Sequence, residues 1–162
     1  MFYDEKNLNI ISVVIPCLNE EKTLGSCIAE AKEGISKSGL EGEVIISDNG
    51  SEDNSKRIAV ENGARVIETQ IKGYGSAIIN GINNAKGDYV IIGDADMTYD
   101  FTEIPKFVNE LESGSDLIIG NRFKGGVEKG AMPFLNKYLG NPFLSMVARV
   151  FFKIQIGDFH CG

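Results

Sequence analysis

Two aspartates stand one residue apart in the run Asp94-Ala95-Asp96, directly after the apolar residues 89–92. Two carboxylates this close repel each other unless a cation or another positive group lies between them. Magnesium and manganese accept such oxygens, and they commonly use one or two protein carboxylates together with substrate phosphates and water. Asp94 and Asp96 are therefore predicted to bind a divalent metal ion. A solvated acidic turn is the alternative.

Polar residues also follow two earlier apolar runs. Residues 10–15 lead into Pro16-Cys17-Leu18-Asn19-Glu20-Glu21, and residues 44–47 lead into Asp48-Asn49-Gly50. A carboxylate at such a place can accept hydrogen bonds from ribose hydroxyls or a base, although Asp-Asn-Gly is also a common turn. Asn or Glu after the first run fits a helix cap equally well. Lys72 precedes a glycine that opens a helical pattern, where it can reach a phosphate or remain solvated.

Other sequence signatures and the overall charge exclude several classes of protein. A Gly-x-x-x-x-Gly-Lys-Ser/Thr phosphate loop is absent, and a single histidine, His160, leaves no Ser-His-Asp set. The net charge of −7 argues against nucleic acid as a partner. Residues 121–153, however, hold six basic side chains and one acidic side chain. This basic stretch either faces phosphates or an anionic membrane surface, or merely flanks ordinary helices.

The elements that must position these residues follow from the hydrophobic pattern. Strands are predicted at residues 10–15, 44–47, 65–68, 89–93 and 117–120. Helices are predicted between them at 24–35, from a cap at Ser51 or Asp53 to before Gly63, at 73–85, and from a cap at Thr102 to about 112. This alternation predicts a single α/β domain with a doubly wound, mostly parallel sheet. Ligands of such sheets bind at the carboxyl ends of the strands.

The C-terminal residues have a different character. Asn141-Pro142 is a good start for a helix at 143–153, whose apolar side chains either complete a core or form a membrane or dimer contact. Three cysteines without a Cys-x-x-Cys pair, no secretory leader and no apolar run of bilayer length predict a cytoplasmic location. We expect residues 1–122 to form the ligand-binding α/β domain and residues 123–162 to form an extension.

Several motifs in this order resemble family-2 glycosyltransferases. The resemblance rests on Val14-Ile15-Pro16-Cys17-Leu18-Asn19-Glu20-Glu21, Asp48-Asn49-Gly50-Ser51-Glu52-Asp53, Lys72-Gly73-Tyr74-Gly75-Ser76-Ala77, Ala85-Lys86-Gly87-Asp88 and Asp94-Ala95-Asp96. Within that family, Gly120-Asn121-Arg122-Phe123 and Asp158-Phe159-His160-Cys161-Gly162 look like the branch with polyprenyl phosphate acceptors, similar to dolichyl-phosphate mannosyltransferase. The resemblance covers nearly the whole chain.

This resemblance implies a glycosyltransferase-A-type fold and a role for each matching position. The nucleotide-sugar donor, linked to UDP or GDP, would contact Pro16, Leu18, Asn19, Glu20, Asp48, Lys72, Asp94, Ala95 and Asp96. Asp94 and Asp96 would hold Mg²⁺ or Mn²⁺ on the diphosphate, with Thr98 as a weaker third partner. Arg122 would meet the acceptor phosphate or the donor diphosphate.

The implied reaction depends on the acceptor. A lipid phosphate is already anionic, so direct displacement with inversion needs no strong base, whereas a sugar hydroxyl needs one, for which Asp158 is the candidate. Such an enzyme would work at the inner face of the membrane through peripheral contact, and a homo-oligomer is a further expectation. Family members usually continue beyond the position of Gly162, so we expect a truncated chain. A nucleotide-sugar-binding module without transfer activity and a nucleotidyltransferase are the alternatives, the second disfavoured because the segment after the first strand is acidic.

Overall fold

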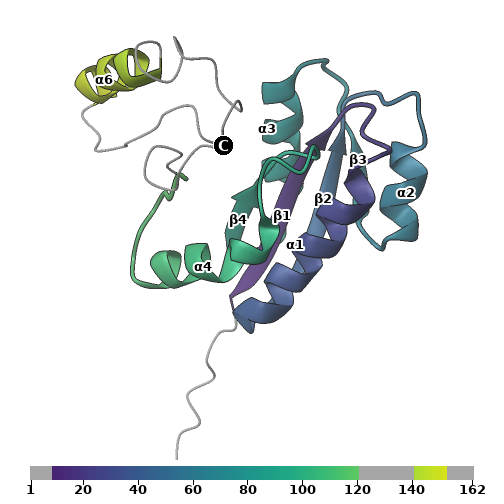
Figure 1. Ribbon diagram of the computed structural model, residues 1–162, viewed down its shortest axis with the longest axis horizontal. Coiled ribbons are helices and arrows are strands. Elements are labelled where there is room, and N and C mark those ends of the chain that lie inside the picture. Colours follow the sequence, from purple (N-terminus) through teal and green to yellow (C-terminus); the bar gives the residue numbers. More distant parts are fainter. Residues whose placement is uncertain (1–8, 121–140, 153–162) are drawn as a thin grey trace, which may run out of the picture. The chain divides into compact units, whose positions relative to one another are not determined.

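A computed structural model describes residues 9–120 and 141–152 of the chain. It separates into two units, Met1–Ser115 and Asp116–Gly162, and each is considered by itself. The first unit is an α/β fold around one sheet (Figure 1). No helix among the described residues is both long and apolar enough to cross a membrane.

The sheet consists of four parallel strands in the order β3-β2-β1-β4. They are β1 (Ile10–Cys17), β2 (Glu41–Asp48), β3 (Arg65–Glu68) and β4 (Tyr89–Ile92). Cys17 pairs with Asp48 and Val14 pairs with Ile92, so β1, β2 and β4 end along one edge of the sheet. The parallel α/β class predicted from the alternating pattern is confirmed.

Helices cover both faces of the sheet. One face carries α1 (Leu24–Ser38), which also packs against α2 (Ser55–Glu61) and α4 (Ile104–Glu112). The other face carries α3 (Tyr74–Asn84), which packs on β1 and β2 (Figure 1). This arrangement places the start of α3 near the strand ends, because the connection from β3 crosses the carboxyl edge of the sheet.

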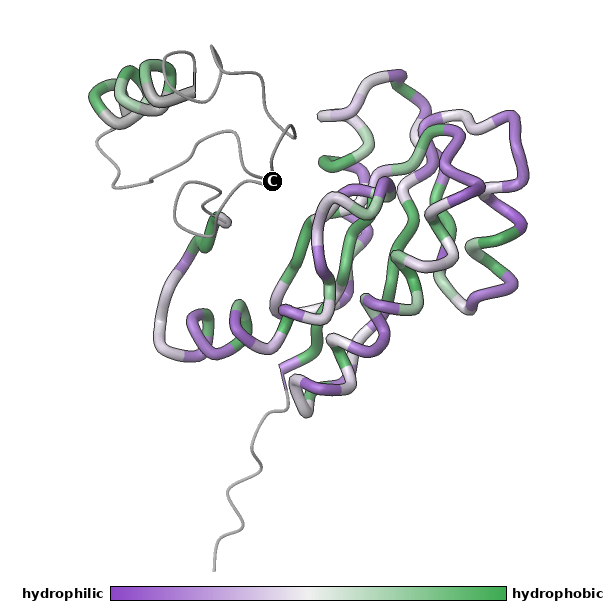
Figure 2. The backbone as a smooth tube through the Cα atoms, viewed as in Figure 1, coloured by the Kyte–Doolittle hydropathy of each residue, from purple (hydrophilic) through white to green (hydrophobic). Residues whose placement is uncertain are grey.

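The core forms on both faces of the two central strands, because β1 is buried from Ile11 to Cys17 and β2 from Val44 to Asp48. In Figure 2, β1 is hydrophobic over most of its length. Ile11, Val13 and Ile15 belong to the cluster that includes buried residues of α1 and α4. Val14 points to the opposite face, where a Cβ added to Gly81 of α3 would come within 2.2 Å of its Cγ1. The absence of a side chain at position 81 therefore allows α3 to lie directly on β1.

Two predictions about these elements are wrong. Residues 117–120 form no strand, and Leu117 is 67% exposed. An apolar run becomes a strand only when it pairs with a neighbour, and the pattern does not show whether a partner exists. The cap of the helix after β4 is also different: Asp100, rather than Thr102, caps a short 3-10 helix, η1 (Phe101–Glu103), by accepting a hydrogen bond from the Thr102 N–H at 2.9 Å.

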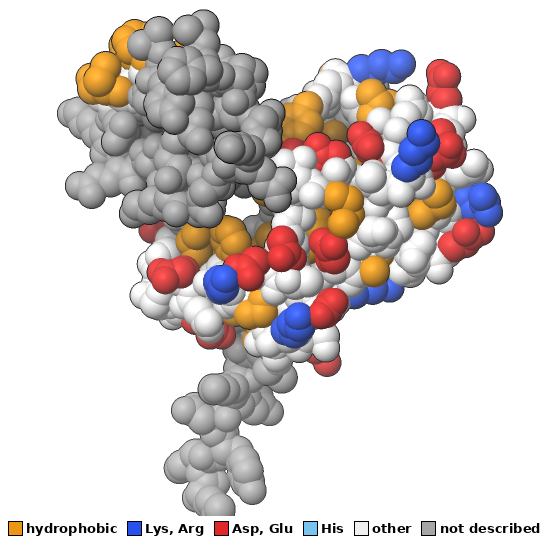
Figure 3. Space-filling view, viewed as in Figure 1, with side chains coloured by type: hydrophobic (Ala, Val, Ile, Leu, Met, Phe, Trp, Pro, Cys, Tyr) orange, Lys and Arg blue, Asp and Glu red, His pale blue; other side chains and the backbone are white. Residues whose placement is uncertain are grey.

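The described part of the second unit contains α6 (Asn141–Phe152), which agrees with the helix predicted there. It is rich in hydrophobic residues (Figure 2). Exposed apolar side chains include Phe143, Leu144, Met146, Val150 and Phe151. Acidic side chains, in contrast, gather on the face of the first unit that carries α1 and α4 (Figure 3).

Candidate functional site

A cavity of about 240 Å³ lies at the carboxyl ends of β1, β2 and β4, beside the start of α3. It is lined by Pro16, Cys17, Leu18, Glu20, Asn49, Tyr74, Ala77, Asp94, Ala95 and Asp96. The parallel strands deliver their following loops to the same edge, and this explains why segments far apart in sequence meet here. The volume is below the roughly 300 Å³ at which pockets begin to enclose a whole drug-sized ligand.

The Asp94-Ala95-Asp96 turn is held on the cavity wall by contacts on both sides. Before it, the Gly93 N–H continues the β4 pairing by donating to the Val14 carbonyl at 3.3 Å. After it, Met97 has a left-handed backbone with φ of 66°, and Asp96 Oδ1 accepts a hydrogen bond from the Thr98 N–H at 2.9 Å. Both carboxylates predicted to bind metal therefore lie on the same cavity.

The donor set indicates which kind of metal site fits. Within residues 9–120 and 141–152, no three Asp, Glu, His or Cys side chains are grouped so that they could hold a metal ion. Asp94 and Asp96 alone do not make a closed structural site. They fit a hard divalent ion that takes its remaining ligands from substrate phosphates and water, as Mg²⁺ and Mn²⁺ commonly do.

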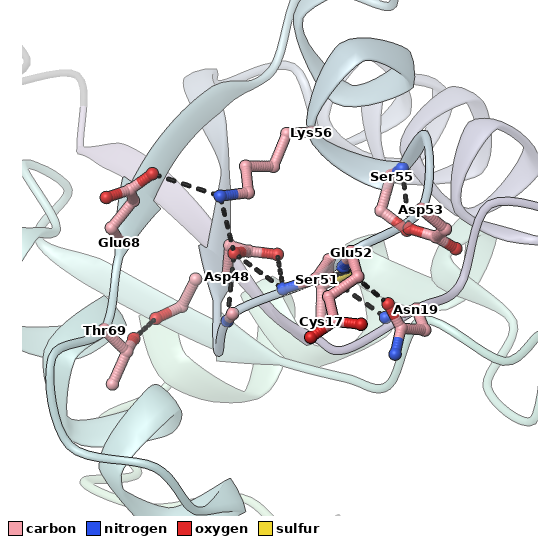
Figure 4. Close-up of polar contacts among 12 residues, drawn as sticks. Cys17, Asn19, Asp48, Ser51, Glu52, Asp53, Ser55, Lys56, Glu68 and Thr69 are labelled. Atoms are coloured by element: carbon pink, nitrogen blue, oxygen red, sulfur yellow. Dashed lines mark hydrogen bonds and ion pairs between the residues drawn. The ribbon is translucent and has the colours of Figure 1, made fainter.

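Asp48 lies behind the cavity rather than on its wall. Its side chain is 1% exposed, and its Oδ2 accepts hydrogen bonds from the N–H groups of Gly50 at 3.0 Å and Ser51 at 3.1 Å (Figure 4). Lys56 Nζ lies 3.6 Å from the same oxygen and also pairs with Glu68. The Asp48 carboxylate thus stabilises the turn that follows β2.

The loop after β1 is fixed against the loop after β2. Asn19 has a left-handed backbone with φ of 60°; its Oδ1 accepts from the Glu52 N–H at 2.8 Å, and its N–H donates to Ser51 Oγ at 3.0 Å (Figure 4). The Glu20 N–H donates to Ser55 Oγ at 2.9 Å. These contacts present Pro16, Leu18 and Glu20 to the cavity. Lys72 is exposed and is not among the lining residues.

Asn49 and Tyr74 line the cavity, and sequence reasoning assigned neither of them to the site. Asn49 is 7% exposed; its Nδ2 donates to the Ile71 carbonyl at 3.2 Å, and its Oδ1 accepts from the Gly73 N–H at 2.7 Å. Tyr74 Oη donates to Asp94 Oδ1 at 2.7 Å. Partial burial raises the pKa of Tyr74, and the hydrogen bond to Asp94 raises it further. Their positions in the sequence could have indicated both residues. Asn49 directly follows a strand, and Tyr74 lies two residues after Lys72, the candidate for phosphate binding.

Cys17 is among the lining residues, although its side chain belongs to the buried core cluster, and Cys17 and Cys27 are both free cysteines. Burial raises the pKa of Cys17, although hydrogen bonds with Ser55 and Ser51 lower it in part. Because the thiolate is the reactive form, this thiol is a packing group at neutral pH. Two further candidates, Arg122 and Asp158, lie outside the described residues.

Proteins of known sequence and structure resemble the chain along most of its length. A hexosyltransferase of low-salt glycan biosynthesis, Agl6 of Haloferax volcanii, is 42% identical over 94% of this chain and 37% of its own. A dolichyl-phosphate hexose transferase of the same organism is 31% identical over 98% of this chain and 66% of its own. Glucosyl-3-phosphoglycerate synthase of Mycobacterium tuberculosis, solved with Mn²⁺, uridine diphosphate and phosphoglyceric acid, superposes with a TM-score of 0.66 at 28% identity over 86% of this chain and 50% of its own.

The chain therefore spans between about a third and two thirds of the length of these relatives. Its structural neighbours have the glycosyltransferase-A-type fold that the resemblance implied. The sequence profile of Glycosyl transferase family 2 matches residues 12–161. This range includes the whole sheet except Ile10 and Ile11, the first two residues of β1. By this match the chain belongs to glycosyl transferase family 2.

Proposed function

We propose that the protein is a metal-dependent glycosyltransferase that uses a nucleoside-diphosphate sugar as donor. The observation that carries this proposal is the position of Asp94 and Asp96 on one cavity at the strand ends, where two carboxylates suit Mg²⁺ or Mn²⁺ bound to a diphosphate. A bound ion of this kind neutralises the negative charge that develops on the departing nucleoside diphosphate. A related enzyme, solved with Mn²⁺ and uridine diphosphate, supports the same donor chemistry.

The donor site is assembled from the loops after β1 and β2. Pro16, Leu18 and Glu20 line the cavity and are the groups proposed to contact the base and ribose. Asn19 and Asp48 complete the same region by holding its two loops in place. Lys72, exposed ahead of α3, is proposed to approach the phosphates, where the N-terminus of a helix favours negative charge.

The proposed acceptor is a polyprenyl-type lipid phosphate, attacked with inversion at the sugar carbon. A relative named as a dolichyl-phosphate hexose transferase aligns with almost the whole chain, which supports this choice. The acceptor oxygen is anionic at neutral pH, so it attacks without a strong general base. Arg122 is proposed to meet the acceptor or donor phosphate, and the exposed apolar residues of α6 suit a site of action at a membrane surface.

A hydroxyl acceptor is the second candidate function. The structural neighbour was solved with phosphoglyceric acid, a molecule whose hydroxyl can accept a sugar. A hydroxyl must lose its proton during attack, and Asp158 is the proposed base. Asp158→Asn should then abolish transfer while preserving donor binding. Unchanged turnover of that variant would remove Asp158 from the mechanism.

Calorimetry tests the donor and metal proposal directly. UDP and GDP are titrated into the protein with and without Mn²⁺, and into the Asp96→Ala variant. We expect one nucleotide to bind in a Mn²⁺-dependent manner, with the dependence lost in the variant. Asp116→Ala, which removes an exposed carboxylate outside the first unit, is the matched control and should bind as the wild type does. Binding that ignores Mn²⁺ and is equal in Asp96→Ala would defeat the proposal.

A further inference from the structure

Tyr74 connects the start of α3 to the loop after β4, which carries Asp94 and Asp96. It is the first residue of α3, yet its Oη donates a hydrogen bond of 2.7 Å to Asp94 Oδ1, in the loop after β4. Its side chain also lines the cavity. A phenol at this place therefore touches one of the two carboxylates proposed to bind the metal ion.

The position of the Tyr74 hydroxyl is fixed from both ends of its helix. Gly73, directly before it, has a φ of 134°, a conformation that favours glycine, and its N–H is bound by Asn49 Oδ1 at 2.7 Å. Further along α3, Ala77 is buried, and Gly81 lies against Val14 of β1. The helix can neither rotate nor retreat from the sheet without breaking these contacts, so the tyrosine meets Asp94 from a defined direction.

The chemistry of a carboxylate gives this contact a specific consequence. An ionised carboxylate offers about four lone-pair sites on two oxygens. One donor on Oδ1 leaves the remaining sites free for a cation, while it limits rotation of the group. Hydrogen bonds of this kind from neighbouring residues orient carboxylates that bind metals and strengthen metal binding. Asp94 also stands close to Asp96 in sequence, and their mutual repulsion would favour a rotamer that turns one of them away.

We propose that Tyr74 is a positioning residue for metal binding: its hydroxyl holds the Asp94 carboxylate in the orientation that presents its free oxygen sites to the divalent ion. This inference rests on the proposed function, because it assumes that the ion binds at Asp94 and Asp96. Tyr74 is not itself a ligand of the ion in this proposal; it acts through Asp94.

Replacing Tyr74 by Phe removes the hydroxyl and keeps the ring. Mn²⁺ is titrated into the protein at one fixed concentration of UDP or GDP, whichever the wild type binds, and its apparent affinity is measured by calorimetry against a blank titration into the nucleotide alone. We expect Tyr74→Phe to bind Mn²⁺ about 10-fold to 100-fold more weakly than the wild type, the loss typical for a group that orients a metal ligand. The matched control is Tyr89→Phe, which removes a hydroxyl bonded to Asn9 at the far end of β4 and should leave the affinity unchanged.

A second measurement separates positioning from a general structural defect. At a fixed low Mn²⁺ concentration Tyr74→Phe should bind the nucleotide weakly, and a 100-fold increase in Mn²⁺ should restore the wild-type affinity because the pocket itself is intact. The melting temperatures of both tyrosine variants are recorded alongside.

The outcomes distinguish this inference from the function on which it rests. Mn²⁺ affinity within twofold of the wild type in Tyr74→Phe overturns the role of Tyr74 while the proposed function stands. Weak nucleotide binding that excess Mn²⁺ does not restore also overturns it. Wild-type protein whose nucleotide binding ignores Mn²⁺ overturns the proposed function and this inference together.

Discussion

Asn49, at the end of β2, binds the Gly73 N–H through its Oδ1 at 2.7 Å and so fixes the residue from which α3 begins. The same side chain donates to the Ile71 carbonyl at 3.2 Å. The Asn49 side chain thus links the loop after β2 to the start of α3. Because Tyr74 is the first residue of α3 and contacts Asp94, the same link extends to the loop after β4.

Replacing Asn49 by Ala should loosen this connection. Asn49 is buried, but the Gly73 N–H and the Ile71 carbonyl belong to exposed residues and can be solvated when their partner is lost, so we expect the free energy of unfolding to fall by about 0.5–1.5 kcal/mol. Mn²⁺-dependent nucleotide affinity should fall as well, since Tyr74 is no longer held. Urea unfolding and calorimetry measure the two effects. Asn83→Ala, at an exposed position of α3, is the control. Equal stability of the two variants would show that the Asn49 side chain does not hold the start of α3 in place.

Asp48→Asn tests whether the buried carboxylate acts on the protein or on the ligand. The amide keeps the shape but replaces one oxygen by a donor, which opposes the N–H groups of Gly50 and Ser51 and leaves Lys56 without its buried partner. We expect a loss of about 1–3 kcal/mol in unfolding free energy. Asp116→Asn serves as the exposed control. A large loss of nucleotide affinity without any loss of stability would show direct contact with the ligand instead.

Two glycines of α3 make a matched pair. Gly81→Ala would place a Cβ 2.2 Å from Val14 Cγ1, so α3 must shift from β1 and the protein should lose about 1–3 kcal/mol of stability. Gly75→Ala meets nothing within 4 Å and should be neutral or stabilising by about 0.5–1 kcal/mol, since alanine restricts the unfolded chain and favours helix. Thermal unfolding of both variants is the measurement. Equal melting temperatures would contradict the close packing of α3.

The lowered pKa of Glu43 predicts that the stability of the protein depends on pH. Burial alone would raise its pKa, but hydrogen bonds from Arg65, the Lys86 N–H and Ser12 outweigh burial and lower it. A carboxylate with a lowered pKa in the folded state stabilises the protein above its ordinary pKa of 4.5. That stabilisation disappears as the pH falls from there through the lowered value.

Glu43→Gln should therefore be less stable than the wild type at pH 7, by about 1–3 kcal/mol, and the difference should shrink as the solution is acidified. Urea unfolding at pH 7 and at successive pH values below 4.5 measures it. Glu61→Gln, in an exposed pair with Arg57, is the control and should differ little from the wild type at any pH. A constant difference across the pH range would show that the carboxylate charge is not responsible.

Much of the fold was predictable because its signals are local. The apolar runs at β1, β2 and β4 and the helical spacing of α1 are properties of short segments, and the alternation of such segments predicts a parallel sheet. The run at 117–120 shows the limit of this reasoning, since whether an apolar run becomes a strand depends on a partner elsewhere in the chain. The cap at Asp100 was missed because Asp and Thr both commonly cap helices, and the sequence does not show at which of Asp100 and Thr102 the helix begins.

The sequence by itself determined that Asp94 and Asp96 follow a strand and that their spacing suits a hard metal ion, because both are matters of residue type and separation. Only the tertiary structure decided which side chains meet them. Tyr74 reaches Asp94 across 20 positions of sequence, and Asn49 reaches Gly73 across 24. Such meetings depend on the order of the strands and on how closely α3 lies on β1, and local patterns do not encode either. The tertiary structure likewise placed Asp48 behind the cavity and Asn49 on its wall, although the two are adjacent in the chain, because successive side chains at the end of a strand point to opposite sides.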